Sequence, residues 1–246
     1  MTKRLISIIL TMGMMLSFST ALPTQASTII NIGDYVQVGK YNDEPIKWRC
    51  VDIDENGPLM LADRILTVKP FDAWGNHTYA DGTLQLDTSD NFRTNHGSNL
   101  WETSNMRCWL NSTATAGNVA WLDGCPPTAD KVYSGWNSYA NEKGFLAEGN
   151  FTTSEQAAIK SVTQKSLLNG KDVDRLSVGG TAIHNYVGAG IETIVQNYDT
   201  AYYHNVTDKM FLLDVKQINK VYQNGTILGA DYYRGKLTQK AIDNSS

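Results

Sequence analysis

The sequence predicts an α+β domain made of an antiparallel sheet, a few short packed helices and long loops. Three observations predict it: β-branched and aromatic runs separated by turn formers, short stretches with helical apolar spacing after capping residues, and long polar segments between them. With 246 residues of which 41% are hydrophobic, the chain can bury one sizeable core or at most two small ones. This composition excludes disordered, collagen-like and multi-span membrane proteins.

Three strands are expected at the start of the domain. Residues 36–41 and 46–52 are rich in β-branched and aromatic side chains, and the turn formers at 42–45 predict a hairpin loop between them. Residues 58–62 supply a third strand after the turn formers at 54–57. These segments predict an antiparallel meander.

A short helix over residues 104–111 is expected to be the central packing helix. Ser104 can cap its first turn, and Met106, Trp109 and Leu110 fall at the i, i+3, i+4 spacing that gives one apolar stripe. We therefore expect Trp109 to be buried, and Arg107 to be held by hydrogen bonds at one end of the sheet.

Three further elements are expected later in the chain. Residues 152–155 have a capping-box pattern, which predicts a helix that runs to about Val162. The apolar run at 210–213 predicts a strand with neighbours on both edges, and 215–222 predicts a helix. The apolar face of this helix would carry Val215, Ile218 and Tyr222.

The first 26 residues predict a secretory signal peptide, which leaves residues 27–246 as a single domain. Lys3 and Arg4 precede an apolar run at 5–16, and small residues lead to Ala26. Removing this segment takes two of 21 Lys+Arg and none of 25 Asp+Glu, so the mature chain carries a net charge of −6. We therefore expect a secreted, extracellular protein without nucleic-acid partners and without integral membrane association after cleavage.

Two long irregular segments, residues 69–100 and 112–150, are the expected binding loops. Indole rings in loops among small polar residues can stack on the apolar face of a sugar or peptide. The candidate ligand-binding residues combine such indoles with nearby polar side chains: Trp74, His77, Tyr79, Asp81 and Trp136. The spacing of the His and Cys residues predicts neither a metal site nor a cofactor.

The three cysteines leave two alternatives open in an oxidising compartment. Cys50, Cys108 and Cys125 can form one disulfide with one spare thiol, or remain three free thiols. Cys108 followed by Trp109 is a weak match to a thiol-protease pattern, because the preceding residues lack glycine and no histidine lies at a suitable spacing. A half-buried helix cysteine is the favoured interpretation.

Residues 52–57 can be interpreted as the start of a calcium loop or as a hairpin turn. Asp52, Asp54 and Asn56 match the ligand spacing of a calcium loop, and Asp63 falls at its twelfth position. An EF-hand needs helices on both sides, whereas these flanks predict strands, and Asn-Gly between strands is a strong hairpin signal. We therefore expect a turn.

Several motifs resemble a known family when they are taken in order: Gly33–Val36, Tyr41, residues 44–49 and 59–61, Trp101-Glu-Thr-Ser, Arg107, Trp109-Leu-Asn and residues 211–213. They resemble an uncharacterised domain of bacterial secreted and surface proteins, the domain of unknown function 6273. The Trp-Glu-Thr-Ser-x-x-Arg-x-Trp-Leu-Asn string is the most specific element. The resemblance covers residues 33–111 and about 150–246.

This resemblance implies an α+β fold distantly similar to C-type-lectin-like and sulfatase-modifying-factor-like domains, whose long loops carry binding or catalysis. The family usually continues into a Trp-rich C-terminal half that closes the sheet, so the resemblance implies that this fold is incomplete. The cysteine pair of the formylglycine-generating relatives would lie in that half, and their type of catalysis is therefore not expected here.

The resulting functional hypothesis is a secreted bacterial domain that binds an extracellular glycan or surface polymer through its long loops. One alternative is a thiol-dependent oxidoreductase or hydrolase that uses Cys108 or Cys125. A second alternative is an incomplete gene product without a function.

Overall fold

The computed structural model describes residues 29–75, 97–122, 125–132, 137–168, 179–184, 191–229, 236–238 and 241–242. Within these residues the chain forms two antiparallel sheets, five α-helices and one 3-10 helix, which confirms the α+β prediction. The expected signal peptide lies outside the described residues. Among the helices that are described, none has the length and apolar character needed to cross a membrane.

The first sheet contains β1 (Tyr35–Tyr41), β2 (Glu44–Asp54) and β3 (Gly57–Ala62) in the order β1-β2-β3. The meander is therefore confirmed. The first connection is shorter than the expected loop, because Tyr41 pairs directly with Glu44. Its two central residues, Asn42 and Asp43, have φ values of 50° and 64°, and a two-residue turn with φ positive at both positions matches the right-handed twist of the strands.

The second connection is the hairpin turn that the sequence predicts at 52–57. Asp54 pairs with Gly57, whose φ of 103° favours glycine. The Asn56 amide donates to Asp54 Oδ1, and the Lys160 ammonium donates to the Asn56 carbonyl at 2.7 Å. The pairing of β2 with β3 therefore begins at residues 54 and 57, where a calcium loop would have its middle ligands. In addition, Lys160 contacts the turn.

Helix α2 (Asn105–Leu110) organises the larger core, as predicted. The Ser104 hydroxyl accepts from the Arg107 amide and caps the helix, which ends at Leu110 with Asn111 as its C-cap. Trp109 is 2% exposed, and its neighbours include the following aromatic rings at centroid distances of 5.2 to 5.8 Å: Tyr41, Tyr139 and Phe145. Met106 and Leu110 pack against this cluster and are partly buried.

The described residues of the segment 112–150 have no regular secondary structure, but many of them belong to the core. Tyr139, Phe145 and Leu146 are buried. The Trp109 indole N–H donates to the Lys143 carbonyl, and the Phe145 amide donates to the Trp109 carbonyl. This part of the expected binding loop therefore wraps the central tryptophan.

The second sheet pairs β4 (Val162–Leu167) with β5 (Tyr203–Asp208). Before it, α3 (Thr153–Ala158) begins with the predicted capping box between Thr152 and Glu155. The predicted end of this helix near Val162 is wrong, since the helix stops at Ala158 and Val162 starts β4.

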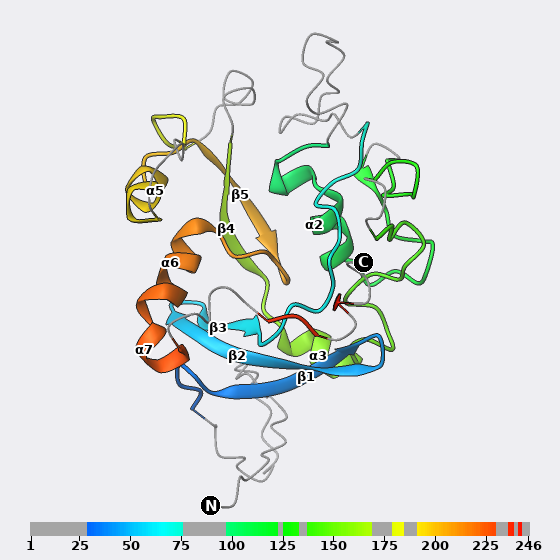
Figure 1. The fold of residues 1–246 in the computed structure, drawn as a ribbon, viewed down its shortest axis with the longest axis horizontal. Coiled ribbons are helices and arrows are strands. Elements are labelled where there is room, and N and C mark those ends of the chain that lie inside the picture. The colour runs from blue at the N-terminus through cyan, green and yellow to red at the C-terminus, as the bar shows by residue number, and fades with distance from the viewer. Residues whose placement is uncertain are drawn as a thin grey trace, which may run out of the picture.

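The remaining helices are α5 (Ile191–Tyr198), α6 (Val215–Gln223) and α7 (Gly225–Leu228). Figure 1 shows α6 and α7 at one end of the first sheet and the β4–β5 pair standing above that sheet. Helix α6 is confirmed, but one residue of its predicted apolar face is wrong. Val215 and Ile218 are half-buried, whereas Tyr222 is 51% exposed. Val221 is buried instead and packs with Val51 of β2.

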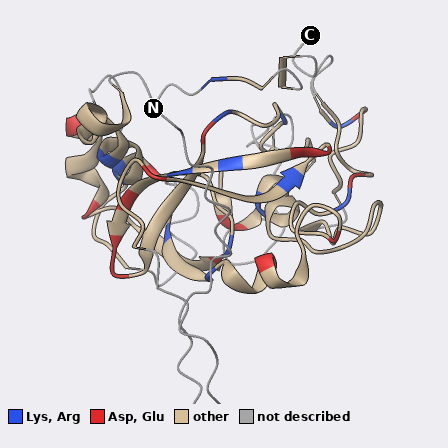
Figure 2. Cartoon of the chain, turned by 90° about the horizontal axis from the view of Figure 1, so that it is seen from below, with Lys and Arg blue, Asp and Glu red and all other residues tan. Residues whose placement is uncertain are grey.

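Lysine and arginine positions are interspersed with aspartate and glutamate positions along the described chain, as Figure 2 shows. Several of these charges pair across long sequence separations. Lys69 contacts Glu142 at 2.5 Å inside the aromatic cluster, and Arg107 contacts Asp208 at 2.9 Å. The second pair joins the central helix to the second sheet.

Candidate ligand-binding site

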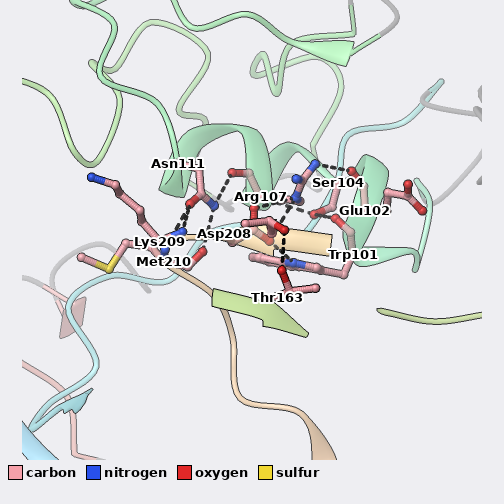
Figure 3. A network of polar contacts seen from close by, with 10 residues as sticks. Trp101, Glu102, Ser104, Arg107, Asn111, Thr163, Asp208, Lys209 and Met210 are labelled. Carbon is pink, nitrogen blue, oxygen red and sulfur yellow. Dashed lines mark hydrogen bonds and ion pairs between the residues drawn. The ribbon is translucent and has the colours of Figure 1, made fainter. Parts of the chain in front are cut away.

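The motif Trp-Glu-Thr-Ser-x-x-Arg holds the end of strand β5. The motif starts at the 3-10 helix η1 (Trp101–Thr103) and continues into α2. The Trp101 indole donates to Asp208 Oδ2 at 2.9 Å, and Arg107 Nε donates to Asp208 Oδ1 at 2.9 Å (Figure 3). Asp208 is the last residue of β5, and its side chain is 2% exposed. Arg107 is therefore held by hydrogen bonds at one end of a sheet, as predicted, but this is the separate β4–β5 sheet and not the single sheet that the sequence predicts.

Asn111, at the end of the same motif, holds the segment after β5. Its Oδ1 accepts from the amides of Lys209 and Met210 at 2.9 and 3.0 Å, and its Nδ2 donates to the Met210 carbonyl at 2.8 Å (Figure 3). The amides and carbonyl that a strand would offer to a neighbouring strand are thus bound by a side chain.

The prediction of a strand at 210–213 is consequently wrong, because these residues form an irregular segment that leads into α6. The apolar residues of this segment do not form a sheet edge.

A pocket of about 650 Å³ lies between this motif, the second sheet and the helices α5 and α6. Its lining residues come from seven separate segments between residues 71 and 215. They are Phe71, Asn99, Leu100, Trp101, residues 164–168, Ile183, His184, Ile194, Val206 and residues 212–215. Most of these side chains are apolar, and the volume falls within the range of about 300 to 1,000 Å³ typical of small-molecule sites.

Ser166 places a buried hydroxyl in the pocket wall. The register pairs Gln164 with Val206 and Ser166 with His204, so Ser166 and Val206 lie on one face of the β4–β5 sheet. Ser166 is 3% exposed, and its Oγ forms no hydrogen bond within the described part of the chain. A buried hydroxyl without a partner is costly, which makes this atom a candidate ligand contact.

The charged residues of the lining have partners within the protein. Asp214 caps α6 through the Gln217 amide and accepts from the Tyr198 hydroxyl at 2.5 Å. Lys165 Nζ lies 4.3 Å from the centre of the Tyr203 ring. Burial lowers the pKa of His184 from its usual 6.5. The pocket therefore offers few groups that would bind a strongly charged ligand.

The sequence-predicted site residues relate only partly to this pocket. Both ends of the expected binding loop 69–100 line it, through Phe71 and through Asn99 and Leu100. Trp74 is half-buried and is not among the lining residues; its amide donates to the Lys131 carbonyl. The other four candidates, His77, Tyr79, Asp81 and Trp136, lie outside the described residues, so their binding role stays a prediction.

Sequence reasoning missed Ser166 and the strand that carries it. Residues 162–167 read Val-Thr-Gln-Lys-Ser-Leu, a mostly polar run with no turn signal that marks its ends. The alternation that places Gln164 and Ser166 on one face is visible only when the partner strand is known.

The three cysteines are free thiols. Burial raises the pKa of Cys50 to about 11, and burial also raises the pKa of Cys108. Cys108 is half-buried in α2, as expected, while Cys125 is buried with its Sγ 3.5 Å from Lys131 Nζ. A nucleophilic cysteine needs a lowered pKa, so the environments of Cys50 and Cys108 do not favour thiol catalysis.

A histidine–carboxylate pair joins β5 to η1. His204 Nδ1 lies 2.7 Å from Glu102 Oε2, but within the described chain no serine or cysteine is hydrogen-bonded to this imidazole. No group of three or more His, Cys, Asp or Glu residues that could hold a metal ion occurs there either.

Comparison of the chain with known protein families, with curated proteins and with solved structures finds no match.

Proposed function

We propose that this protein is an exported, extracellular binding domain whose ligand occupies the pocket between Trp101 and the β4–β5 sheet. The observation that carries the proposal is the pocket itself, about 650 Å³ in volume with an unpartnered buried hydroxyl in its wall. Binding domains commonly use a concave, mostly apolar pocket with a few polar groups that orient the ligand.

We also propose that the chain belongs to the family that it resembles and shares its C-type-lectin-like fold. The support is that the residues of the most specific motif act together on one segment of the chain. Trp101, Arg107 and Asn111 all bind the stretch from Asp208 to Met210 (Figure 3). Because this motif fixes two distant segments relative to each other, proteins that share the fold would need the same sequence pattern.

Binding is favoured over thiol catalysis at Cys108, because burial raises the pKa of its thiol. Phe71, Asn99 and Leu100 lie at the two ends of the loop 69–100 and line the pocket, so a glycan or surface polymer held there would contact both ends of this loop.

Immobilised oligosaccharides and solubilised cell-surface polymer test the binding proposal. We expect the exported protein to bind a member of this set, and expect Leu212→Asp to weaken binding, because Leu212 lines the pocket and is 51% exposed. Ile227→Asp is the matched control, since Ile227 is 54% exposed and lies outside the lining. Equal binding by both variants and the unmodified protein would contradict a ligand in this pocket.

Export has its own test. The intact mass of the protein recovered from the culture medium should correspond to a chain that begins near Ser27. A cell-bound product that retains residues 1–26 would contradict the proposed location.

A further inference from the structure

We infer that the pocket takes an uncharged amphipathic small molecule with an apolar body and one hydroxyl or carbonyl group, and that Ser166 binds this polar group. This inference rests on the proposed binding function and names the class of ligand. Of the two ligands proposed above, it favours a surface polymer that carries such an amphipathic group over a free sugar, which would bring many hydroxyl groups into the same space.

The lining favours an apolar ligand body. Leu100, Leu168 and Val206 are buried residues whose surfaces form part of the wall, and Trp101 and Phe71 add two rings with centroids 6.3 Å apart. Apolar area removed from water contributes about 25 cal/mol per Å², so a rigid hydrocarbon would gain affinity from this wall. Sugar hydroxyls placed against it would lose their hydrogen bonds to water without replacement.

The exposed apolar side chains of the lining point to the same class of ligand. Ile183 and Leu212 line the pocket and are 57% and 51% exposed. Two large apolar side chains that face water can cover the part of an apolar ligand that extends beyond the buried wall. A strongly polar ligand would gain nothing from them.

One polar group of the ligand has a defined place. Ser166 Oγ is buried, and no described residue is hydrogen-bonded to it. A hydroxyl can donate or accept, so it can serve an alcohol or a carbonyl equally. Trp101 Nε1 is already bound to Asp208, and Asp214 is bound to Tyr198 and Gln217, so neither competes for the ligand's polar group.

The test uses two fluorescent probes that differ by one hydroxyl group, 1-pyrenemethanol and 1-methylpyrene. We expect the exported protein to bind both, and to bind the alcohol about fivefold more tightly because it gains one hydrogen bond. Ser166→Ala should remove this difference while it leaves the affinity for 1-methylpyrene unchanged. Leu212→Asp should weaken binding of both probes, and Ile227→Asp should weaken neither.

The outcomes separate this inference from the proposed function. If neither probe binds but an oligosaccharide does, in a manner sensitive to Leu212→Asp, the binding function stands and the ligand class is wrong. If neither probe nor any oligosaccharide or polymer binds, both proposals fail. If Ser166→Ala leaves the preference for the alcohol intact, the assigned role of Ser166 is overturned.

Discussion

Arg107 Nε donates to Asp208 Oδ1 at 2.9 Å, and the second oxygen of the same carboxylate accepts from the Trp101 indole at 2.9 Å. The ion pair therefore fixes the indole that lines the pocket. It also ties the central helix to the last residue of β5, so the position of one pocket wall depends on these two side chains.

Removing one partner of this ion pair should be costly. Arg107→Met leaves a carboxylate that is 2% exposed with only the Trp101 N–H as a described side-chain partner, and unpaired buried charges cost about 3 to 5 kcal/mol. Asp208→Asn should also destabilise, but the double variant should lose less than the sum of the two single losses. Urea unfolding of the four proteins measures this coupling. Additive losses would show that the two side chains stabilise the fold independently.

Truncation of the central tryptophan should remove much of the stability of the domain. Trp109→Ala deletes a side chain that is 2% exposed and packed among three aromatic rings, and such a change costs about 3 to 5 kcal/mol. Trp121→Ala is the control, because Trp121 is only half-buried and contacts the edge of Tyr139. A urea midpoint that moves no further for Trp109→Ala than for Trp121→Ala would place the core elsewhere.

The central helix and the first sheet could be predicted because their signals are local. Trp109 follows a capping serine at helical spacing, and the turn residues Asn42 and Asp43 lie directly between two β-branched runs. The second sheet has no such signal. Residues 210–213 look like a strand by hydropathy alone, yet the side chain of Asn111, about 100 residues earlier, binds the backbone at Lys209 and Met210.

The pocket was beyond prediction for a similar reason. Its wall joins Phe71, Trp101, Ser166 and Leu212, and no spacing in the sequence indicates that these residues meet. The sequence pointed to the loop 69–100 because of its length and polarity. Of the residues of this loop that the structure describes, Phe71, Asn99 and Leu100 line the pocket.

Stability should fall above pH 10. Burial raises the pKa of Tyr41, Tyr139 and Tyr198 above the usual 10.0. As the pH rises, these phenols therefore lose their protons in the unfolded chain before they do so in the folded chain. Their contribution to the free energy of unfolding is complete below pH 10 and is lost above it. Lys69 has the opposite effect. Burial lowers its pKa from 10.5, so its contribution to the free energy of unfolding increases with pH until the pH reaches 10.5.

The measurement is the free energy of unfolding in urea between pH 9 and pH 11.5. Each tyrosine that stays protonated in the folded state should cost up to about 1.4 kcal/mol per pH unit above pH 10. Tyr198→Phe removes one of the three phenols and should make the decline less steep. A free energy of unfolding that stays constant over this range would contradict the raised pKa values.

Calcium should not stabilise the protein through the hairpin at 52–57. The Asn56 carbonyl is bound by Lys160, and Asp54 accepts from the Asn56 amide within the turn. Millimolar calcium over a site of micromolar affinity would add roughly 4 kcal/mol and raise the melting temperature by several degrees. We expect no such shift. A rise that Asp54→Ala abolishes would show that the turn binds calcium.

The binding of an amphipathic ligand beside Ser166 is tested most directly by a crystal structure of the exported protein with 1-pyrenemethanol. We predict electron density for the ring system between Trp101 and Val206, with the ligand hydroxyl within hydrogen-bond distance of Ser166 Oγ. A pocket filled by the protein's own side chains, with Ser166 Oγ hydrogen-bonded to one of them, would contradict it.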